Sequence, residues 1–458
     1  MSRFDRRVIS ILVTLAALIG LVAWRGDRVG APVVSLNPAP DAAGVSTRAV
    51  IRVTFGQEMA TDMAAPLLLN PTVSGTLRWE GKTLAFTPSA PLAPETTYTV
   101  TLAAGLASQQ GRPVLAPPTW RFTTGQTRLL FIGRDNKDHD QLTLALPARA
   151  SVSIAPAGGA PIALTQESFG VWDYALSSDG TAIVYAAMRR DGGSDLVTIA
   201  PDGRERRKRL DCSQAMCNGA AWLPDGQRLI YERHALPAPG AFPAPGRLWM
   251  LNLDTGQTEP LFQDSQKLGF GPRISPDGQW LAYFAPSEGA VQLVRLSDGR
   301  NLMAPSQMGE PPVWNPRGDA VAMSDILFMG ERTAVHLFRV DLESSGVTDI
   351  SGDESVDDGA PDWSPDGEWI AFRRKSPAAA MSAQIWVMRR DGTQARQLTD
   401  DERYFHSALT WSPDGRTLAI QRVRLEGVNV SSGIWLLDVT TGQLRELVSP
   451  GARPTWLP

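Results

Sequence analysis

A short turn motif recurs from residue 127 to the end of the chain and constrains the fold more than any other feature. It occurs at residues 176–180, 222–226, 274–278, 314–318, 363–367 and 411–415, and three copies contain Ser-Pro-Asp-Gly. Successive copies begin 40 to 52 residues apart, which is the length of one four-stranded propeller blade. In this motif Ser caps the turn, Pro fixes φ and Gly ends the turn. Each copy is therefore predicted to join the first two strands of a blade.

Apolar strands and tryptophans follow each turn at regular positions. Third strands are predicted at residues 248–251, 385–388 and 434–437, each with a central tryptophan. The tryptophans at repeat positions are interpreted as blade-to-blade packing and not as a sugar-binding surface: Trp222, Trp249, Trp280, Trp314, Trp363, Trp369, Trp386, Trp411, Trp435 and Trp456. The aspartates of the turns are interpreted as turn formers and not as catalytic carboxylates: Asp179, Asp225, Asp277, Asp366 and Asp414.

The two ends of the repeat region complete each other. Residues 456–458 resemble a first strand without successors, and residues 129–132 resemble a second strand without a predecessor. Pairing these two segments would close the ring and remove both exposed edges. The pattern predicts seven blades, one of them composite, with six blades as the alternative. The third strand of the composite blade stays open, because residues 142–146 and 152–155 both fit it.

The repeats resemble the TolB-like (WD-repeat-like) propeller family. They carry its strings Trp-Ser-Pro-Asp-Gly, as at residues 411–415, and Ile-Trp followed by Asp-Gly, as at residues 385–392. The family's namesake has six blades and an α/β N-terminal domain, and this chain departs from both features. The motif is specific for the fold and says little about function.

Residues 31–125 have the pattern of a β-sandwich. Apolar and polar residues alternate at 51–55 and 97–102, as in strands with one buried face. The segment resembles the bacterial Ig-like family of surface proteins in its opening Asn37-Pro38, in Val53-Thr54-Phe55, in residues 84–88 and in its closing Phe122-Thr123-Thr124. The resemblance implies a spacer or adhesive module. The whole chain is thus expected to be all-β, with a sandwich at 31–125 and a propeller at 126–458.

Residues 1–30 are expected to lie outside the globular domains. Residues 8–24 carry no charge, three arginines precede them and Arg25 follows. Such a segment is a signal peptide or a membrane anchor, and a helix of this length would span about 26 Å, near the thickness of the hydrocarbon core. We expect an uncleaved single-pass anchor, with a cytoplasmic N-terminus and the bulk of the chain extracytoplasmic, in the periplasm or on the cell surface.

Composition and charge exclude some functions. The chain has 44 basic and 48 acidic side chains and a net charge of −4, so bulk charge does not make it a nucleic-acid binder. Cys212 and Cys217 are the two cysteines and could form a disulfide in an oxidising compartment. With four scattered histidines they do not have the spacing of a zinc site.

Long, variable loops gather on one predicted face of the propeller. Second-to-third loops are expected at 232–247, 324–333, 373–384 and 421–433, and fourth-to-first connections at 351–361 and 399–407. Loops on a rigid scaffold commonly carry binding. The candidate contact residues form an acidic group and a mixed group: Asp353, Glu354, Asp357 and Asp358, and Arg403, Tyr404, Phe405 and His406.

No cofactor is expected. Calcium is the one ion that a cluster suggests, at Asp135, Asn136, Asp138 and Asp140, but the spacing matches no complete calcium loop. The sequence also lacks Gly-x-Ser-x-Gly and His-Glu-x-x-His.

Three functions remain open. The first is a membrane-tethered protein whose loop face binds a protein or a cell-envelope glycan. The second is an enzyme, such as a glycan lyase or hydrolase, that uses carboxylates of the central channel. The third is a structural component of the cell envelope, for which self-association would be the sign.

Overall fold

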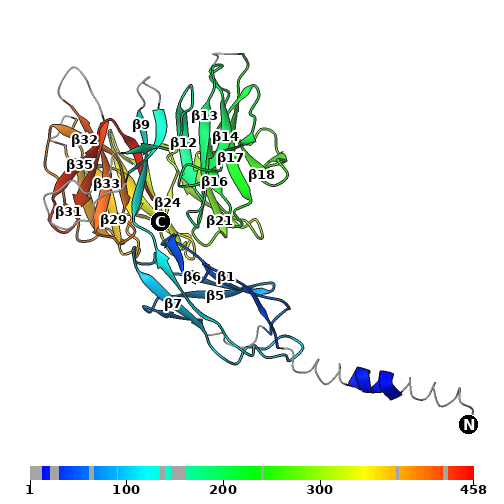
Figure 1. Ribbon diagram of the computed structural model, residues 1–458. Coiled ribbons are helices and arrows are strands. Elements are labelled where there is room, and N and C mark those ends of the chain that lie inside the picture. Colours follow the sequence, from blue (N-terminus) through cyan, green and yellow to red (C-terminus); the bar gives the residue numbers. More distant parts are fainter. Residues whose placement is uncertain are drawn as a thin grey trace, which may run out of the picture. The chain divides into compact units, whose positions relative to one another are not determined.

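The computed structural model describes residues 13–20, 30–60, 67–89, 91–134, 140–145, 161–238, 242–377, 381–425 and 432–457. Apart from one short helix at residues 13–20, the regular structure of these residues is β-strand (Figure 1). The chain divides into two compact units. One contains Met1–Val45 and Ala49–Gly125, and the other contains Ser46–Arg48 and Gln126–Pro458.

The N-terminal segment contradicts the predicted membrane anchor. In the part of residues 8–24 that the structure describes, the helix covers eight residues, 13–20. Among the described residues no helix is long and apolar enough to cross a bilayer. The single-pass localisation expected from the sequence is therefore wrong.

The first unit is a sandwich of two four-stranded sheets. One sheet has the strand order β1 (Val33–Asn37), β3 (Ile51–Phe55), β6 (Thr83–Pro88), β5 (Gly75–Glu80). The other has the order β2 (Ala42–Val45), β8 (Thr119–Thr124), β7 (Thr97–Leu102), β4 (Leu67–Asn70). The alternation seen in the sequence is the inward and outward alternation of β3 and β7, and their buried residues share one core. Tyr98 is buried in this core, and its hydroxyl accepts a hydrogen bond from the Ala93 N–H at 2.9 Å.

The second unit is a β-propeller of antiparallel sheets. Four of its sheets are simple meanders of four strands each. The first consists of β20 (Phe270–Ile274), β21 (Trp280–Ala285), β22 (Ala290–Arg295) and β23 (Asn301–Pro305), and the second of β24 (Val313–Trp314), β25 (Ala320–Met329), β26 (Arg332–Asp341) and β27 (Val347–Asp349). The third consists of β28 (Asp357–Trp363), β29 (Trp369–Lys375), β30 (Gln384–Arg389) and β31 (Arg396–Gln397), and the fourth of β32 (Tyr404–Trp411), β33 (Thr417–Arg424), β34 (Ser432–Asp438) and β35 (Leu444–Val448).

An eight-stranded sheet contains two further meanders, joined by one parallel bridge between Ser194 and Met216. Its strands are β12 (Val171–Leu176), β13 (Ile183–Met188), β14 (Ser194–Ile199), β15 (Arg207–Leu210), β16 (Ala215–Trp222), β17 (Arg228–Ala235), β18 (Arg247–Asn252) and β19 (Thr258–Pro260). First strands of neighbouring meanders contact one another, for example β12 with β16 and β28 with β32. These first strands therefore form the innermost layer of the propeller.

The remaining sheet joins the two ends of the propeller, as predicted. Its strands are β36 (Ala452–Leu457), β9 (Arg128–Arg134), β10 (Asp140–Ala145) and β11 (Ile162–Ala163). Trp456 pairs with Leu129, and Thr455 pairs with Leu130. β36 also contacts β32 and β33 of the preceding sheet, so the ring closes (Figure 1). The third strand of this sheet is β10, the first of the two segments that the sequence left open.

The repeated turns have the predicted geometry. In the copy at residues 411–415, the Gly415 N–H donates to the Ser412 carbonyl at 2.9 Å. Ser412 Oγ donates to Asp414 Oδ1 at 2.6 Å and accepts the Thr417 N–H at 3.0 Å. The same bonds recur around Ser177, Ser275 and Ser364. The aspartates of these turns are thus bound to their own turns. We call the side of the propeller that carries these turns the turn face, and the opposite side, with the second-to-third and fourth-to-first connections, the loop face.

Tryptophans at the ends of the first strands connect neighbouring sheets. Trp411 Nε1 donates to the Asp362 carbonyl at 3.2 Å, and Trp456 Nε1 donates to the Thr410 carbonyl at 3.1 Å. Trp222, Trp314 and Trp363 make the equivalent bond to the preceding sheet. The interpretation of these tryptophans as blade-to-blade packing is confirmed for this position.

The connections on the loop face are shorter than predicted, because the strands extend into them. β25 and β26 pair from Ala320 to Asp341 and leave a tight hairpin where the sequence indicated a loop at 324–333. β28 begins at Asp357 and β32 at Tyr404, so these two fourth-to-first connections are residues 350–356 and 398–403. A β-bulge interrupts each of these first strands, between Gly359 and Asp362 and between His406 and Ala408. The bulge breaks the alternation by which a strand is recognised in a sequence.

Candidate functional site

The predicted acidic group does not form a single patch. Asp353 and Glu354 are exposed in the connection before β28. Asp353 Oδ1 accepts bonds from the Ser355 N–H at 2.9 Å and the Ser355 hydroxyl at 2.7 Å. These bonds lower the pKa of Asp353. Asp353 and Glu354 are therefore available to a partner, and Asp353 is held in a local turn.

Asp357 and Asp358 lie on β28 and have structural roles. Asp357 Oδ1 accepts the Val335 N–H of the neighbouring sheet at 3.0 Å. Asp358 is buried against Arg374, with bonds of 2.7 Å from Nε and 2.6 Å from Nη2. Burial raises the pKa of Asp358, although the guanidinium opposes this effect. This geometry does not support their prediction as contact residues, because Asp358 is inaccessible and Asp357 is half-buried and bound to the neighbouring sheet.

The mixed group is organised by Arg422, which was not among the residues predicted from the sequence. The Arg422 guanidinium lies 3.8 Å from the centre of the Tyr404 ring and 4.6 Å from the Trp435 ring. Arg422 Nη2 is 3.4 Å from Asp401 Oδ2. Arg403 pairs with the same carboxylate at 2.9 Å, and chiefly this bond lowers the pKa of Asp401 to about 2. The signal that could have found Arg422 is its position four residues after the first leucine or isoleucine of a second strand, where Arg374 and Arg233 also lie.

His406 is a buried residue of the first strand. It has no exposed surface, and its Nδ1 is 2.6 Å from the Ala383 carbonyl of the preceding sheet. Burial lowers the pKa of His406 to about 4, so its imidazole is neutral at neutral pH. Phe405 is half-buried, with the Arg373 guanidinium 5.3 Å from its ring centre. Of the mixed group, Arg403 is the exposed member.

Cys212 and Cys217 form a disulfide at the start of β16. Both residues are fully buried. The Cys212 N–H donates to Asp195 Oδ1 at 3.0 Å, and Ser194 Oγ exchanges bonds with the backbone of Cys217 at 2.7 and 3.0 Å. The disulfide therefore lies where the two halves of the eight-stranded sheet meet.

The residues suggested for calcium lie mostly outside the described part of the chain. Asp135, Asn136 and Asp138 belong to that undescribed part. Asp140 lies on β10, and its carboxylate is 3.5 Å from Arg134 Nε. Within the ranges that the structure describes, no three histidine, cysteine, aspartate or glutamate side chains group as metal ligands.

More of the exposed apolar side chains of the propeller lie on the loop face than on the turn face. Between residues 126 and 457, the described residues include nine exposed large apolar side chains. Five of them lie in or beside connections of this face: Phe169, Trp172, Phe242, Phe328 and Met381. One, Leu296, lies in a turn of the opposite face, and the other three lie on outer strands. Exposed aromatic and methionine side chains are typical of protein interfaces.

Arginines cover the tryptophans of the second and third strands. The Arg233 guanidinium lies 5.2 Å from the Trp249 ring centre, and Arg374 lies 5.0 Å from that of Trp386. Trp280 and Trp369 are covered in the same way by Arg295 and Arg389. A sugar needs a free ring face for stacking, so these covered faces are poor platforms for a glycan.

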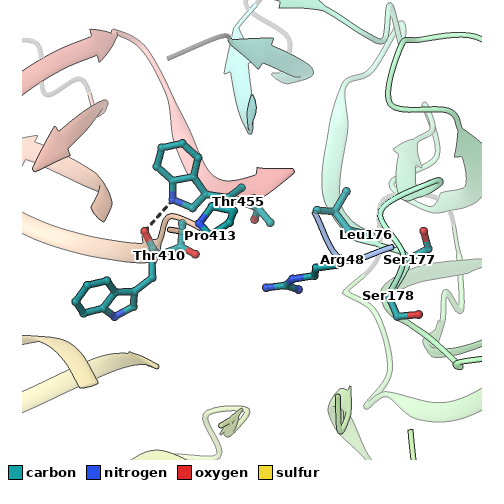
Figure 2. A pocket seen from close by; sticks show the side chains of 9 residues that line it. Arg48, Leu176, Ser177, Ser178, Thr410, Pro413 and Thr455 are labelled. Atoms are coloured by element: carbon teal, nitrogen blue, oxygen red, sulfur yellow. Dashed lines mark hydrogen bonds between the residues drawn. The ribbon is translucent and has the colours of Figure 1, made fainter. Parts of the chain in front are cut away.

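One cavity lies on the turn face, and its volume is about 170 Å³ (Figure 2). Its lining consists of Arg48, Leu176, Ser177, Ser178, Thr410, Trp411, Pro413, Thr455 and Trp456. Ser177 and Trp456 already use their polar groups in the turn and in the bond to Thr410. Ligand pockets usually enclose about 300 to 1,000 Å³, so this cavity is too small for an oligosaccharide or a peptide.

Carboxylates near the innermost strands bind backbone N–H groups of the next sheet. Asp173 Oδ2 accepts the Gly219 N–H at 2.7 Å, and Glu232 Oε1 accepts the Gly271 N–H at 2.7 Å. Asp362 Oδ2 accepts the Trp411 N–H at 2.9 Å, and burial raises the pKa of Asp362 to about 6. These groups thus help to join neighbouring sheets.

Comparison with known proteins matches a family model to a part of each of the two units. Residues 244–458 match the TolB beta propeller domain, and residues 27–124 match the bacterial Ig-like domain. The two resemblances found in the sequence are thereby confirmed.

Individual relatives are more distant. An uncharacterized protein of Agrobacterium fabrum, Atu1656, is 28% identical over 197 residues, which are 39% of this chain and 57% of that protein. A puromycin-hydrolyzing peptidase of Mycobacterium tuberculosis shares 15% identity with a TM-score of 0.51, over 73% of this chain and 53% of the peptidase. A puromycin hydrolase S511A mutant has a TM-score of 0.52 and 18% identity, over 72% and 53% of the two chains. The chain thus spans little more than half of these proteins, and the structural likeness shows the fold alone.

Proposed function

We propose that the propeller is a binding module that recognises a partner protein through its loop face. The observation that carries this proposal is the larger number of exposed apolar side chains on that face, among them Phe242, Phe328 and Met381. Asp353, Glu354 and Arg403 lie exposed on the same face and can supply a polar rim. An apolar centre with a polar rim is the usual composition of a protein interface.

Two features favour a protein over a glycan as the partner. The tryptophans of the second and third strands carry guanidinium groups on their ring faces, as for Trp249 and Trp386. The cavity of the turn face, at about 170 Å³, is too small for an oligosaccharide.

The hydrogen bonds of the inner carboxylates favour binding over catalysis. Asp173, Glu232 and Asp362 each accept a backbone N–H of the next sheet. A general acid or base needs a free oxygen within reach of a substrate proton, and these carboxylates serve first as links between sheets. The puromycin-hydrolysing proteins share the propeller fold, but their likeness to this chain does not extend to an activity.

We further propose that the ring contains seven blades and that the Ig-like domain is a spacer. Support for the number comes from the two meanders within the eight-stranded sheet, the four simple meanders and the sheet that contains β36 and β9. Support for the spacer comes from the resemblance of residues 31–125 to the bacterial Ig-like family.

Chemical cross-linking to an extract of the source cells, followed by mass spectrometry, tests the proposed function. Wild type is compared with the triple variant Phe242→Ser, Phe328→Ser, Met381→Ser and with the control Leu296→Ser on the opposite face. We expect the triple variant to lose a partner protein that the wild type and the control both retain. Equal capture by all three proteins would contradict the proposal. Loss of a glycan instead would indicate the other partner class, and cross-linked copies of this chain alone would indicate a structural component.

A further inference from the structure

Two arginines of the innermost strands form no ion pair with any residue that the structure describes. Arg273 lies on β20 and Arg453 lies on β36, and both side chains are exposed. In the part of the chain that the structure describes, no carboxylate oxygen lies within 4.0 Å of either guanidinium. At the residue before the turn motif, where β20 has Arg273, the strands β16, β24 and β32 have Ala221, Val313 and Thr410. Arg273 is thus a charge that the repeat itself does not require.

Most donors of these guanidinium groups make no hydrogen bond to the residues that the structure describes. Arg273 Nη1 donates to the Pro272 carbonyl at 3.1 Å, and Arg453 Nη1 donates to the Trp172 carbonyl at 3.0 Å. A guanidinium has five N–H groups, and no other acceptor binds these two side chains among the described residues. Each arginine can therefore offer a pair of parallel donors to a ligand.

The nearest carboxylates are already engaged. Asp173 accepts the Gly219 N–H, and Glu232 accepts the Gly271 N–H and lies 3.0 Å from His234 Nε2. Burial raises the pKa of Asp173, and the charges of Arg453 and Arg273 lower it by less. Desolvation also lowers the pKa of Arg273, which lies on the inner strand β20 with its side chain exposed.

The backbone of Arg453 supplies an independent observation. Its φ is +52°, in a bulge of β36. The bulges of β16 and β20 have glycine at the corresponding left-handed position, Gly219 with φ +57° and Gly271 with φ +59°. A side chain in this conformation costs about 1 kcal/mol or more, and such strain concentrates at functional sites. An exposed arginine makes few packing contacts that could offset this strain.

We infer that Arg273 and Arg453 bind an anionic group, a carboxylate or a phosphate, of a small ligand along the inner strands of the propeller. The planar fork of a guanidinium matches both anions with two parallel hydrogen bonds. The inference does not depend on the proposed binding of a partner protein by the loop face.

Calorimetric titration of the full chain at low salt tests the site with two probes, inorganic phosphate and succinate. We expect at least one probe to bind in about the millimolar range, which corresponds to a few bonds between charged groups. The probe that binds distinguishes a phosphate-bearing from a carboxylate-bearing ligand. Arg273→Gln is expected to weaken the binding about tenfold or more. Absence of binding by either probe would overturn the inference.

Arg453→Gly separates ligand binding from stability. Because glycine tolerates the positive φ, we expect this variant to raise the Tm while it weakens anion binding. Ala360→Gly is the matched control, since Ala360 has φ +51° in the bulge of β28 and no charge. It should raise the Tm and leave the affinity unchanged. Wild-type affinity in both Arg273→Gln and Arg453→Gly would refute the site.

Discussion

The two faces of the propeller are held by different kinds of contact, local in the chain on one face and long-range on the other. On the turn face, each motif closes on itself, as when Ser412, Asp414 and Thr417 bind one another within six residues. On the loop face, residues depend on distant partners: Asp358 binds Arg374, and His406 binds the carbonyl of Ala383 in another sheet. The repeat thus makes one face uniform and leaves the other free to vary. The following changes test this division in order of decreasing effect.

The largest effect is expected where the ring closes. Trp456→Ala removes a buried ring and its bond to the Thr410 carbonyl, and we expect a loss of about 3–5 kcal/mol in the free energy of unfolding. Urea denaturation measures this loss. Trp172→Ala, at a tryptophan that is 47% exposed on the loop face, is the control and should cost far less. Equal losses of unfolding free energy in the two variants would show that ring closure has no special role in stability.

Acid should weaken the loop face through His406. Its folded-state pKa of about 4 lies below its ordinary 6.5, so the unfolded chain binds this proton more tightly. The free energy of unfolding should fall by about 3 kcal/mol as the pH drops from about 6.5 to about 4. Asp362, with a pKa raised to about 6, acts with the opposite sign. The difference in the free energy of unfolding between wild type and His406→Gln therefore isolates the contribution of the histidine. If this free energy changed with pH in the same way in both proteins, the proposed role of His406 would be contradicted.

Loss of the disulfide should have a moderate effect. Cys212 and Cys217 are five residues apart, and a loop of this size contributes about 2 kcal/mol in the chain-entropy description. The double change Cys212→Ser, Cys217→Ser should lower the Tm by several degrees, and a reducing agent should lower that of the wild type alike. If the reducing agent also lowered the Tm of the double variant, the fall in the Tm of the wild type would not come from this disulfide.

The smallest effect compares two similar turns. Asp414→Ala on the turn face should cost about 1 kcal/mol, since it leaves Ser412 without its acceptor. Asp353→Ala on the loop face removes equivalent bonds to Ser355, but all of these groups are exposed and water replaces them, so the cost should stay below about 0.5 kcal/mol. Thermal denaturation distinguishes the two, and a reversed order would contradict the division between the faces.

The sequence predicted those features whose cause is local or periodic. The turns, the tryptophan spacing and the unmatched strands at the two ends all lie in short segments, and the pairing of Trp456 with Leu129 follows from them. The candidate site was less predictable. Bulges hid the starts of β28 and β32, so Asp358 and His406 were expected in loops although they lie buried on strands. Arg422 organises the mixed group by lying against the rings of Tyr404 and Trp435, and these three residues come together only in the folded chain.

The sheet that joins β36 to β9 also has a consequence for synthesis. β9 is made long before its partner β36, because all other strands of the propeller lie between them in the chain. Until β36 has been made, one edge of β9 remains unpaired, while the sandwich can fold earlier because its strands precede β9. We therefore expect the propeller to close only after β36 has left the ribosome, and its first sheet to be the one that a chaperone must shield.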